Sequence, residues 1–232
     1  MRSSRRGGRS DPVSSRPYHP GDDLRQIDRH ASARLSAVLG RTELIVREHL
    51  AEEAAEVVAV VDDGPTMRLH PPPWLSKPAA LERALGMIEA SARRARSRFE
   101  LRQGTDGLRP GSFVFVLSDF LEPPPERFWL DALDRRLDPI PVVLQDPVWE
   151  RSFPDVARTA LPIADPATGR VRPTRLSRRE AQARRRRNEE RFDALVSGLE
   201  SLGLEPVVIA SDDETAVLEA FLAWSELRRR AA

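Results

Sequence analysis

One uninterrupted apolar run constrains the fold of this 232-residue chain more than any other feature. Residues Val57 to Val61 are four valines and an alanine, with no polar residue between them. Such a run is typical of a strand buried on both faces, as in the middle of a parallel sheet. Asp62, Asp63, a glycine and a proline follow at once. We therefore expect a sharp turn that leaves acidic side chains at the carboxyl end of the strand, where open α/β sheets bind ligands.

Apolar runs and amphipathic segments alternate along the rest of the chain. Strands are predicted at residues 43–48, 57–61, 113–117, 140–144 and 207–209. Helices are predicted at 76–98, from 123, at 178–202 and at 211–227, and residues 147–177 should be irregular apart from one short hairpin. This alternation predicts an α/β fold with a doubly wound, mostly parallel sheet flanked by helices.

Composition suggests three regions. Residues 1–17 are rich in Arg, Ser, Gly and Pro, and we expect a disordered, Arg-rich N-terminal tail. Residues 18–50 hold a Pro-Gly-Asp-Asp segment, a short helix from Asp23 and the first strand, and residues 51–232 form the α/β domain. The chain has no cysteine, no apolar run long enough to span a bilayer and no signal-peptide pattern. We expect a cytoplasmic protein without a membrane partner.

Charge gives little reason to predict nucleic-acid binding. The chain has 37 basic and 36 acidic residues, and Lys77 is its one lysine, so arginine is the default cation. The arginines of residues 178–187 could contact phosphates, but Glu180 interrupts them and no stacking aromatic lies among them. We interpret this run as a solvated helix face and expect no nucleic-acid partner.

Two acids follow strands that should be neighbours in the sheet. Asp62 follows the first buried strand and Asp119 follows the strand at 113–117. Two converging carboxylates, with the hydroxyl of Thr66, would suit Mg²⁺, which prefers few carboxylates plus water. The alternative is that these acids cap helix starts or remain solvated.

Three segments together resemble a known family. They read RPYHPGDDLRQIDRHASAR at residues 16–34, VVAVVDDGPTM at 57–67 and VFVLSDFL at 114–121. In this order they resemble domain-of-unknown-function family 58 (DUF58), whose members carry a von Willebrand factor A-like (vWA) domain. The resemblance extends from about residue 16 to the C-terminus, and it implies a vWA-like, Rossmann-like fold.

The resemblance also implies a metal-ion-dependent adhesion site (MIDAS), formed in such domains by an Asp, two serines, a threonine and a later Asp. Asp62 and Asp119 match the two Asp positions, and Thr66 matches the second serine. Gly64 replaces the first serine and offers no ligand, while Thr105 is the candidate for the threonine. The strand and helix that normally surround that threonine should be missing or much shortened between residues 98 and 111. We therefore expect Mg²⁺ binding to be weakened or lost.

Members of the family are usually encoded with MoxR-type AAA ATPases and are thought to act as adaptors in chaperone-like maturation. The resemblance therefore implies a non-enzymatic protein-binding module that works with such an ATPase on a client. Its recognition surface would combine the MIDAS positions with further residues of the first two segments and of the loop that follows the second: Asp22, Asp23, Arg25, Asp28, Asp63 and Trp74.

The alternative is a magnesium-dependent hydrolase or phosphotransferase. Asp62 or Asp63 would be the nucleophile and Asp119 would hold the metal. Against this interpretation, no catalytic signature is present, and Lys77 lies in the first predicted helix rather than near a later strand, where it could stabilise charge.

Overall fold

The computed structural model describes residues 14–17, 28, 31–32, 35, 44–48, 55–68, 75–156, 159–165 and 170–231. The chain divides into two compact units, residues 1–54 and 55–232. Within the described residues, no helix combines the length and the apolar character needed to cross a membrane.

The smaller unit contains a two-stranded antiparallel sheet. Strand β1 (Ser14–Pro17) pairs with β2 (Ile45–Glu48), with Ser14 opposite Glu48 and Pro17 opposite Ile45. Residues 14–17, which composition assigns to the disordered tail, form this strand because pairing with β2 supplies backbone partners that composition does not reveal. Residues 1–13 and the start of the predicted helix at Asp23 lie outside the described residues.

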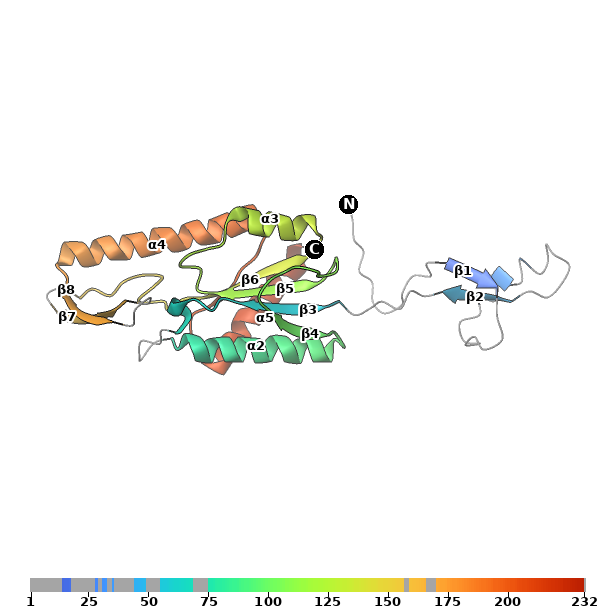
Figure 1. The fold of residues 1–232 in the computed structure, drawn as a ribbon, viewed down its shortest axis with the longest axis horizontal. Coiled ribbons are helices and arrows are strands. Elements are labelled where there is room, and N and C mark those ends of the chain that lie inside the picture. Colours follow the sequence, from blue (N-terminus) through green and yellow to red (C-terminus); the bar gives the residue numbers. More distant parts are fainter. Residues whose placement is uncertain are drawn as a thin grey trace. The chain divides into compact units, whose positions relative to one another are not determined.

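The larger unit is built on five parallel strands in the order β4-β3-β5-β6-β9 (Figure 1). They are β3 (Val57–Val61), β4 (Phe99–Arg102), β5 (Phe113–Ser118), β6 (Asp138–Leu144) and β9 (Val207–Ile209). This is the flavodoxin-like order of a doubly wound sheet, so the predicted α/β fold is confirmed. Strand β3 lies between β4 and β5, and its Val58 and Ala59 are fully buried.

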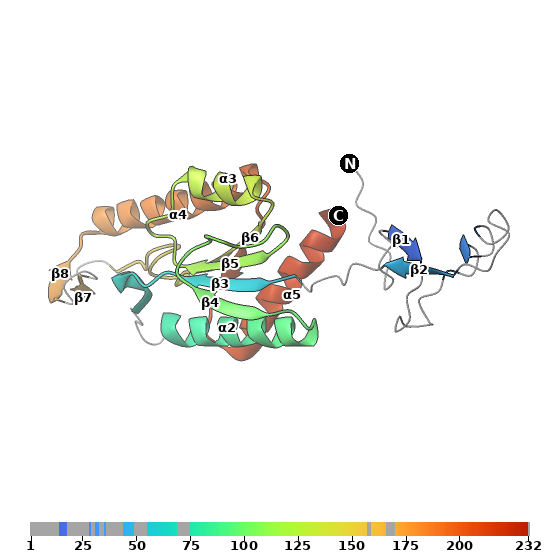
Figure 2. The same ribbon diagram turned by 45° about the vertical axis from the view of Figure 1, so that its right-hand side comes forward.

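Helices cover both faces of this sheet (Figures 1 and 2). Helices α2 (Lys77–Arg94) and α5 (Glu214–Ala231) lie on one face, and α3 (Glu126–Asp134) and α4 (Arg178–Ser201) lie on the other. Consecutive residues of β3 belong to opposite cores, because Val57 and Ala59 pack in the α2 and α5 cluster whereas Val58 packs in the α3 cluster. The apolar run of β3 thus contributes side chains to the apolar core on both faces of the sheet.

Strand β4 lies within residues 98–111, where a missing or much shortened strand was expected, and its four-residue sequence FELR carries two charged residues. It is the edge strand of the sheet, and Glu100 and Arg102 lie in register with Val58 and Val60 of β3. From β4 the chain reaches β5 through residues 103–112 without a helix. No crossover helix therefore covers β4 on this side. The strand carries the charged residues Glu100 and Arg102 there, and Arg102 Nε lies 3.6 Å from Glu100 Oε1.

Helix ends differ from the predictions by a few residues. Helix α2 starts after the predicted N-cap Ser76 but ends at Arg94, because Arg96 adopts a left-handed conformation with φ of 56°. Helix α5 begins after Asp213, whose Oδ1 accepts a hydrogen bond from the Ala216 backbone N–H, and not directly after Ser211.

The predicted hairpin within residues 147–177 is formed by β7 (Ala160–Ala164) and β8 (Val171–Arg175). Helix α4 follows β8 and opens with a capping box, in which Ser177 and Glu180 each bond the backbone N–H of the other. Figure 1 shows the hairpin and the start of α4 beyond the end of the sheet toward which the strands point.

Candidate functional site

Three acids lie at the carboxyl edge of the sheet, each directly after or near the end of a neighbouring strand. Asp62 follows β3, Asp119 follows β5, and Asp146 comes two residues after β6. The Asp62 backbone N–H donates to the carbonyl of Leu117, which keeps the ends of β3 and β5 together. The structure therefore brings Asp62 and Asp119 to one edge, as the strand pattern predicts.

Both carboxylate oxygens of Asp62 are engaged within the chain. Oδ1 accepts a hydrogen bond of 2.8 Å from the Gly64 backbone N–H, and Oδ2 accepts one of 2.6 Å from the Ser118 hydroxyl. The Ser118 hydroxyl oxygen also accepts a bond from the Phe120 backbone N–H. Asp62 thus fixes the turn after β3 and joins it to the end of β5.

The centre of the site is the ammonium group of Lys77, which sequence analysis did not assign to it. Lys77 Nζ lies 2.7 Å from Asp119 Oδ2 and 3.2 Å from the carbonyl oxygen of Thr66, and it also donates to Glu150 Oε1. The Lys77 residue is only 1% exposed. An ammonium has three N–H donors, and here each has an oxygen acceptor.

Helix α2 carries Lys77 to this position because of its register. The buried residues of α2 are Lys77, Ala80, Ala84, Ile88 and Ala92, which recur at steps of three and four. Lys77 is the first residue after the N-cap and thus stands at the positive end of the helix dipole, where a cation is unfavourable. The carboxylates of Asp119 and Glu150 offset this cost.

Glu150 joins the edge of the sheet to helix α4. Its Oε1 accepts from Lys77, its Oε2 accepts from the Asp146 backbone N–H, and its carbonyl oxygen accepts from Arg191 of α4. Burial raises the pKa of Glu150 above its ordinary value of 4.5, although the positive charge of Lys77 acts in the opposite direction.

Helix α4 is fastened to the turn that contains Glu150. The side-chain amide of Asn188 donates to the carbonyls of Trp149 and Ser152, and Arg185 Nε donates to the carbonyl of Phe153 at 2.8 Å. A small apolar cluster of Phe153, Leu176 and Ala181 lies beneath this contact. Helix α4, which carries the exposed arginines, is therefore attached to the turn at residues 149–153 by these hydrogen bonds.

With the ammonium of Lys77 in place, the residues at this edge do not fit a bound Mg²⁺ ion. Asp119 Oδ2 bonds Lys77 and Oδ1 bonds the Leu121 backbone N–H, so both oxygens already have partners. A Cβ atom at Gly64 would lie 2.9 Å from Asp62 Oδ1, so a serine there would force Asp62 to move. Within the described part of the chain, no three acidic or histidine side chains form a group that could hold a metal ion.

The remaining predicted site residues have different environments. Asp63 is exposed, and Thr66 contacts Lys77 through its backbone carbonyl and not through the predicted hydroxyl. Asp28 accepts from the Ala31 backbone N–H, as a helix cap does, and its own N–H donates to the carbonyl of Ile45. The other predicted partner-binding residues lie outside the described residues: Asp22, Asp23, Arg25 and Trp74.

Thr105 does not join the acids at the carboxyl edge. Its hydroxyl and carbonyl oxygens accept hydrogen bonds from Arg135, the C-cap residue of helix α3. The loop of residues 103–112 is therefore fastened to α3, and the threonine of the implied metal site has no counterpart there.

Contrary to the expectation that no lysine lies near a later strand, Lys77 contacts Asp119 at the end of β5. Sequence reasoning also missed Glu150. Two signals point to them: the single lysine of an arginine-rich chain stands in the buried register of α2, and Glu150 belongs to a segment, VWERSFPD, that begins four residues after the end of β6.

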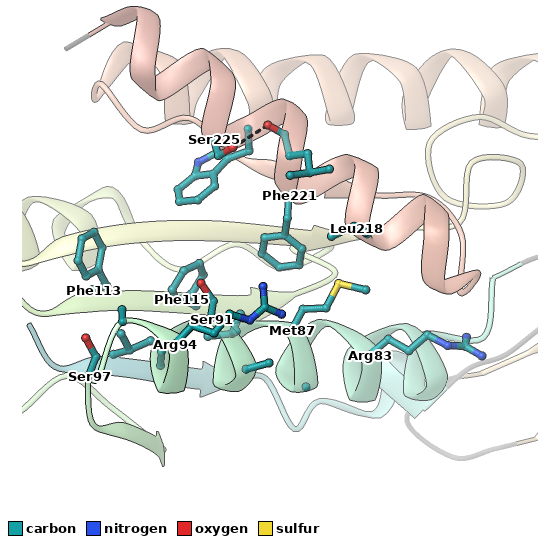
Figure 3. Close-up of a pocket in the computed structure, with 18 of the residues that line it drawn as sticks. Arg83, Met87, Ser91, Arg94, Ser97, Phe113, Phe115, Leu218, Phe221 and Ser225 are labelled. Atoms are coloured by element: carbon teal, nitrogen blue, oxygen red, sulfur yellow. Dashed lines mark hydrogen bonds between the residues drawn. The ribbon is translucent and has the colours of Figure 1, made fainter.

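A groove lies elsewhere on the domain, between α2 and α5 (Figure 3). It has a volume of about 950 Å³, and Met87, Phe113, Phe115 and Phe221 are among the side chains that line it. None of the acids at the carboxyl edge lines this groove. The apolar groove and the charged edge are therefore separate features of the domain.

Comparison with known proteins gives no further guide, since no protein-family model, no curated protein and no solved structure matches the chain.

Proposed function

We propose that the chain is a non-enzymatic, cytoplasmic protein-binding module of the DUF58 vWA-like type, acting with a MoxR-type AAA ATPase in the maturation of a client. The observation that carries this proposal is the enclosure of Lys77 Nζ by Asp119, Glu150 and the Thr66 carbonyl. The positive charge of Lys77 is thus matched within the chain by two carboxylates. What remains for a partner is the exposed surface around them.

The same enclosure argues against the hydrolase alternative. A nucleophile or general base must reach its substrate, but Asp119 is only 1% exposed and both oxygens of Asp62 have donors within the chain. Asp63 is exposed, yet it has no lysine or metal site beside it among the described residues. A binding role does not require these acids to be exposed or free of hydrogen-bond partners.

A strongly basic surface adjoins the carboxyl edge, and we call it the basic arm. It comprises residues 170–191, which are β8 and the first half of α4, and contains ten arginines and three glutamates. The rest of the chain carries 27 basic and 33 acidic residues, so the coding preference for arginine alone does not explain this concentration. The basic arm favours an acidic partner.

Arg185 and Arg191 attach α4 to the turn at residues 149–153, whereas three exposed arginines of the basic arm have no such role. Cations in the first turn of a helix oppose its dipole, and like charges three or four residues apart repel by about 0.2–0.5 kcal/mol per pair. Arg179, Arg186 and Arg187 are exposed, and none of them forms an ion pair with another described residue. Their charge is available to a partner.

The partner we propose is an acidic face of the ATPase rather than nucleic acid. The basic arm contains no aromatic residue on which a base could stack, and Glu180, Glu189 and Glu190 interrupt its positive charge. Protein partners with matched acidic patches tolerate such a mixed surface, because they can place cations opposite those glutamates.

The test is binding of the purified chain to the MoxR-type ATPase of the same genome, measured by calorimetry at low and high salt. Reversal of Arg179, Arg186 and Arg187 to Glu should weaken binding by about tenfold or more and reduce its salt dependence. The matched control reverses Arg94, Arg96 and Arg230, which are exposed and lie outside the basic arm, and should leave affinity within about twofold.

Two results would contradict the proposal. One is an ATPase affinity that does not change on reversal of the basic arm while the protein stays folded. The other is retention of duplex DNA, abolished by the same reversal, when no ATPase binding is detected.

A further inference from the structure

We infer that Lys77 is a built-in replacement for a divalent cation, and that its side chain covers a latent Mg²⁺ site formed by Asp119, Glu150 and the Thr66 carbonyl. This inference rests on the geometry of the carboxyl edge and is independent of the partner. It implies that the native protein works without a metal ion.

The ligands around Lys77 are those that Mg²⁺ uses. Asp119 Oδ2 and Glu150 Oε1 are carboxylate oxygens, and Thr66 contributes a backbone carbonyl oxygen. Mg²⁺ is held in proteins by one or two carboxylates and keeps several waters. Removal of the lysine side chain beyond Cβ would free both the charge and the volume for such a hydrated ion.

Gln145 provides an independent observation at the same place. It is fully buried, and its side-chain amide donates to the carbonyl oxygen of Asp119. Its Oε1 has no hydrogen-bond partner among the described residues. A buried acceptor without a donor is costly, and in Lys77→Ala a water bound to Mg²⁺ beside Asp119 would supply that donor.

The choice of lysine over arginine fits this role. Every other basic residue of the chain except histidine is arginine. An ammonium is compact and can direct three donors to oxygens around one point, whereas a guanidinium is a flat fork. Among the common cations of proteins, the lysine head group is thus the one nearest to a point-like metal ion.

The experiment compares melting temperatures of the full chain with and without millimolar MgCl₂ or MnCl₂, at ionic strength matched with NaCl. Wild type should not shift. Lys77→Ala should melt lower than wild type without a divalent ion and gain about 5 °C or more at saturating Mg²⁺. Lys77→Met, which fills the space, and Lys77→Ala/Asp119→Asn, which removes a ligand, should not gain.

A shift of wild type itself, or equal response of Lys77→Ala and Lys77→Met, would overturn the inference. If Lys77→Ala does not fold, ¹⁵N-lysine labelling of wild type gives the decisive measurement, because the chain has one lysine. We expect one slowly exchanging side-chain ammonium signal that MgCl₂ leaves unchanged. Rapid exchange with water, or displacement of the signal by Mg²⁺, would refute the inference.

Discussion

Three buried or half-buried charges at the carboxyl edge depend on one another. Lys77 faces Asp119 and Glu150, and the charges of both acids also act on Arg191 of helix α4. Burial lowers the pKa of Arg191, and the two acids oppose that effect. Loss of any one of these charges should lower the stability of the fold, because the charges that remain would be buried without their partner.

The first prediction concerns Lys77→Met. This change leaves two carboxylates without their cation and should lower the free energy of unfolding by about 3–5 kcal/mol. Lys77→Arg should recover little of that loss, because a planar guanidinium cannot match the three acceptors. Equilibrium denaturation in urea measures both values. Arg94→Met, an exposed cation on the same helix, is the control and should cost less than about 0.5 kcal/mol.

The second prediction concerns the pH dependence that Glu150 contributes. Its folded-state pKa is raised above 4.5 by burial, so the folded state holds its proton more tightly than the unfolded state does. The stability contribution of Glu150 is therefore complete below about pH 4.5 and is lost as pH rises through the raised pKa. The unfolding free energy of wild type relative to Glu150→Gln should fall over this window, and a difference that rises with pH would contradict the assignment.

Residue identity alone explains why Lys77 was overlooked. A lysine beside an N-cap is expected to be solvated, since long cations usually extend into water. Its position in the series of buried residues of α2 was available in the sequence, but Asp119 is 42 residues away and Glu150 is 73 residues away. Their meeting is a consequence of the sheet order, which a single sequence does not encode locally.

At the level of elements, the long apolar strands and amphipathic helices were predictable, and the short polar ones were not. Strand β9 coincides with its prediction because its three residues are all apolar and β-branched, whereas β4 is half charged and owes its position to pairing with β3. Strand β1 likewise depends on β2. Pairing partners distant in sequence decide such cases, and local propensity does not.

The third prediction concerns the support of the basic arm. Phe153 is buried against Leu176 and Ala181, and its ring packs on Trp149. Phe153→Ala should remove this local core and loosen the first half of α4 while the sheet remains intact. Hydrogen exchange should therefore rise in residues 171–187 but not in β5 or β6. Equal acceleration in all three regions would show that the arm is not a separate unit of stability.

For the whole molecule, the three apolar clusters decide what can fold alone. Every residue of these clusters belongs to the unit of residues 55–232. The fourth prediction is that residues 55–232 fold without the smaller unit. Their melting temperature should lie within about 4 °C of that of the full chain, which corresponds to about 1–2 kcal/mol for a domain of this size. Loss of cooperative melting on truncation would contradict this account of the core.

The central claim is that the ammonium of Lys77 is enclosed at the carboxyl edge, and the single lysine of the chain allows a direct test. The native protein is treated with a limiting amine-acetylating reagent, and acetylated peptides are mapped by mass spectrometry. The account predicts acetylation of the α-amino group but not of Lys77, with both modified in denaturant. Acetylation of Lys77 in the folded protein, at the rate seen in denaturant, would contradict it.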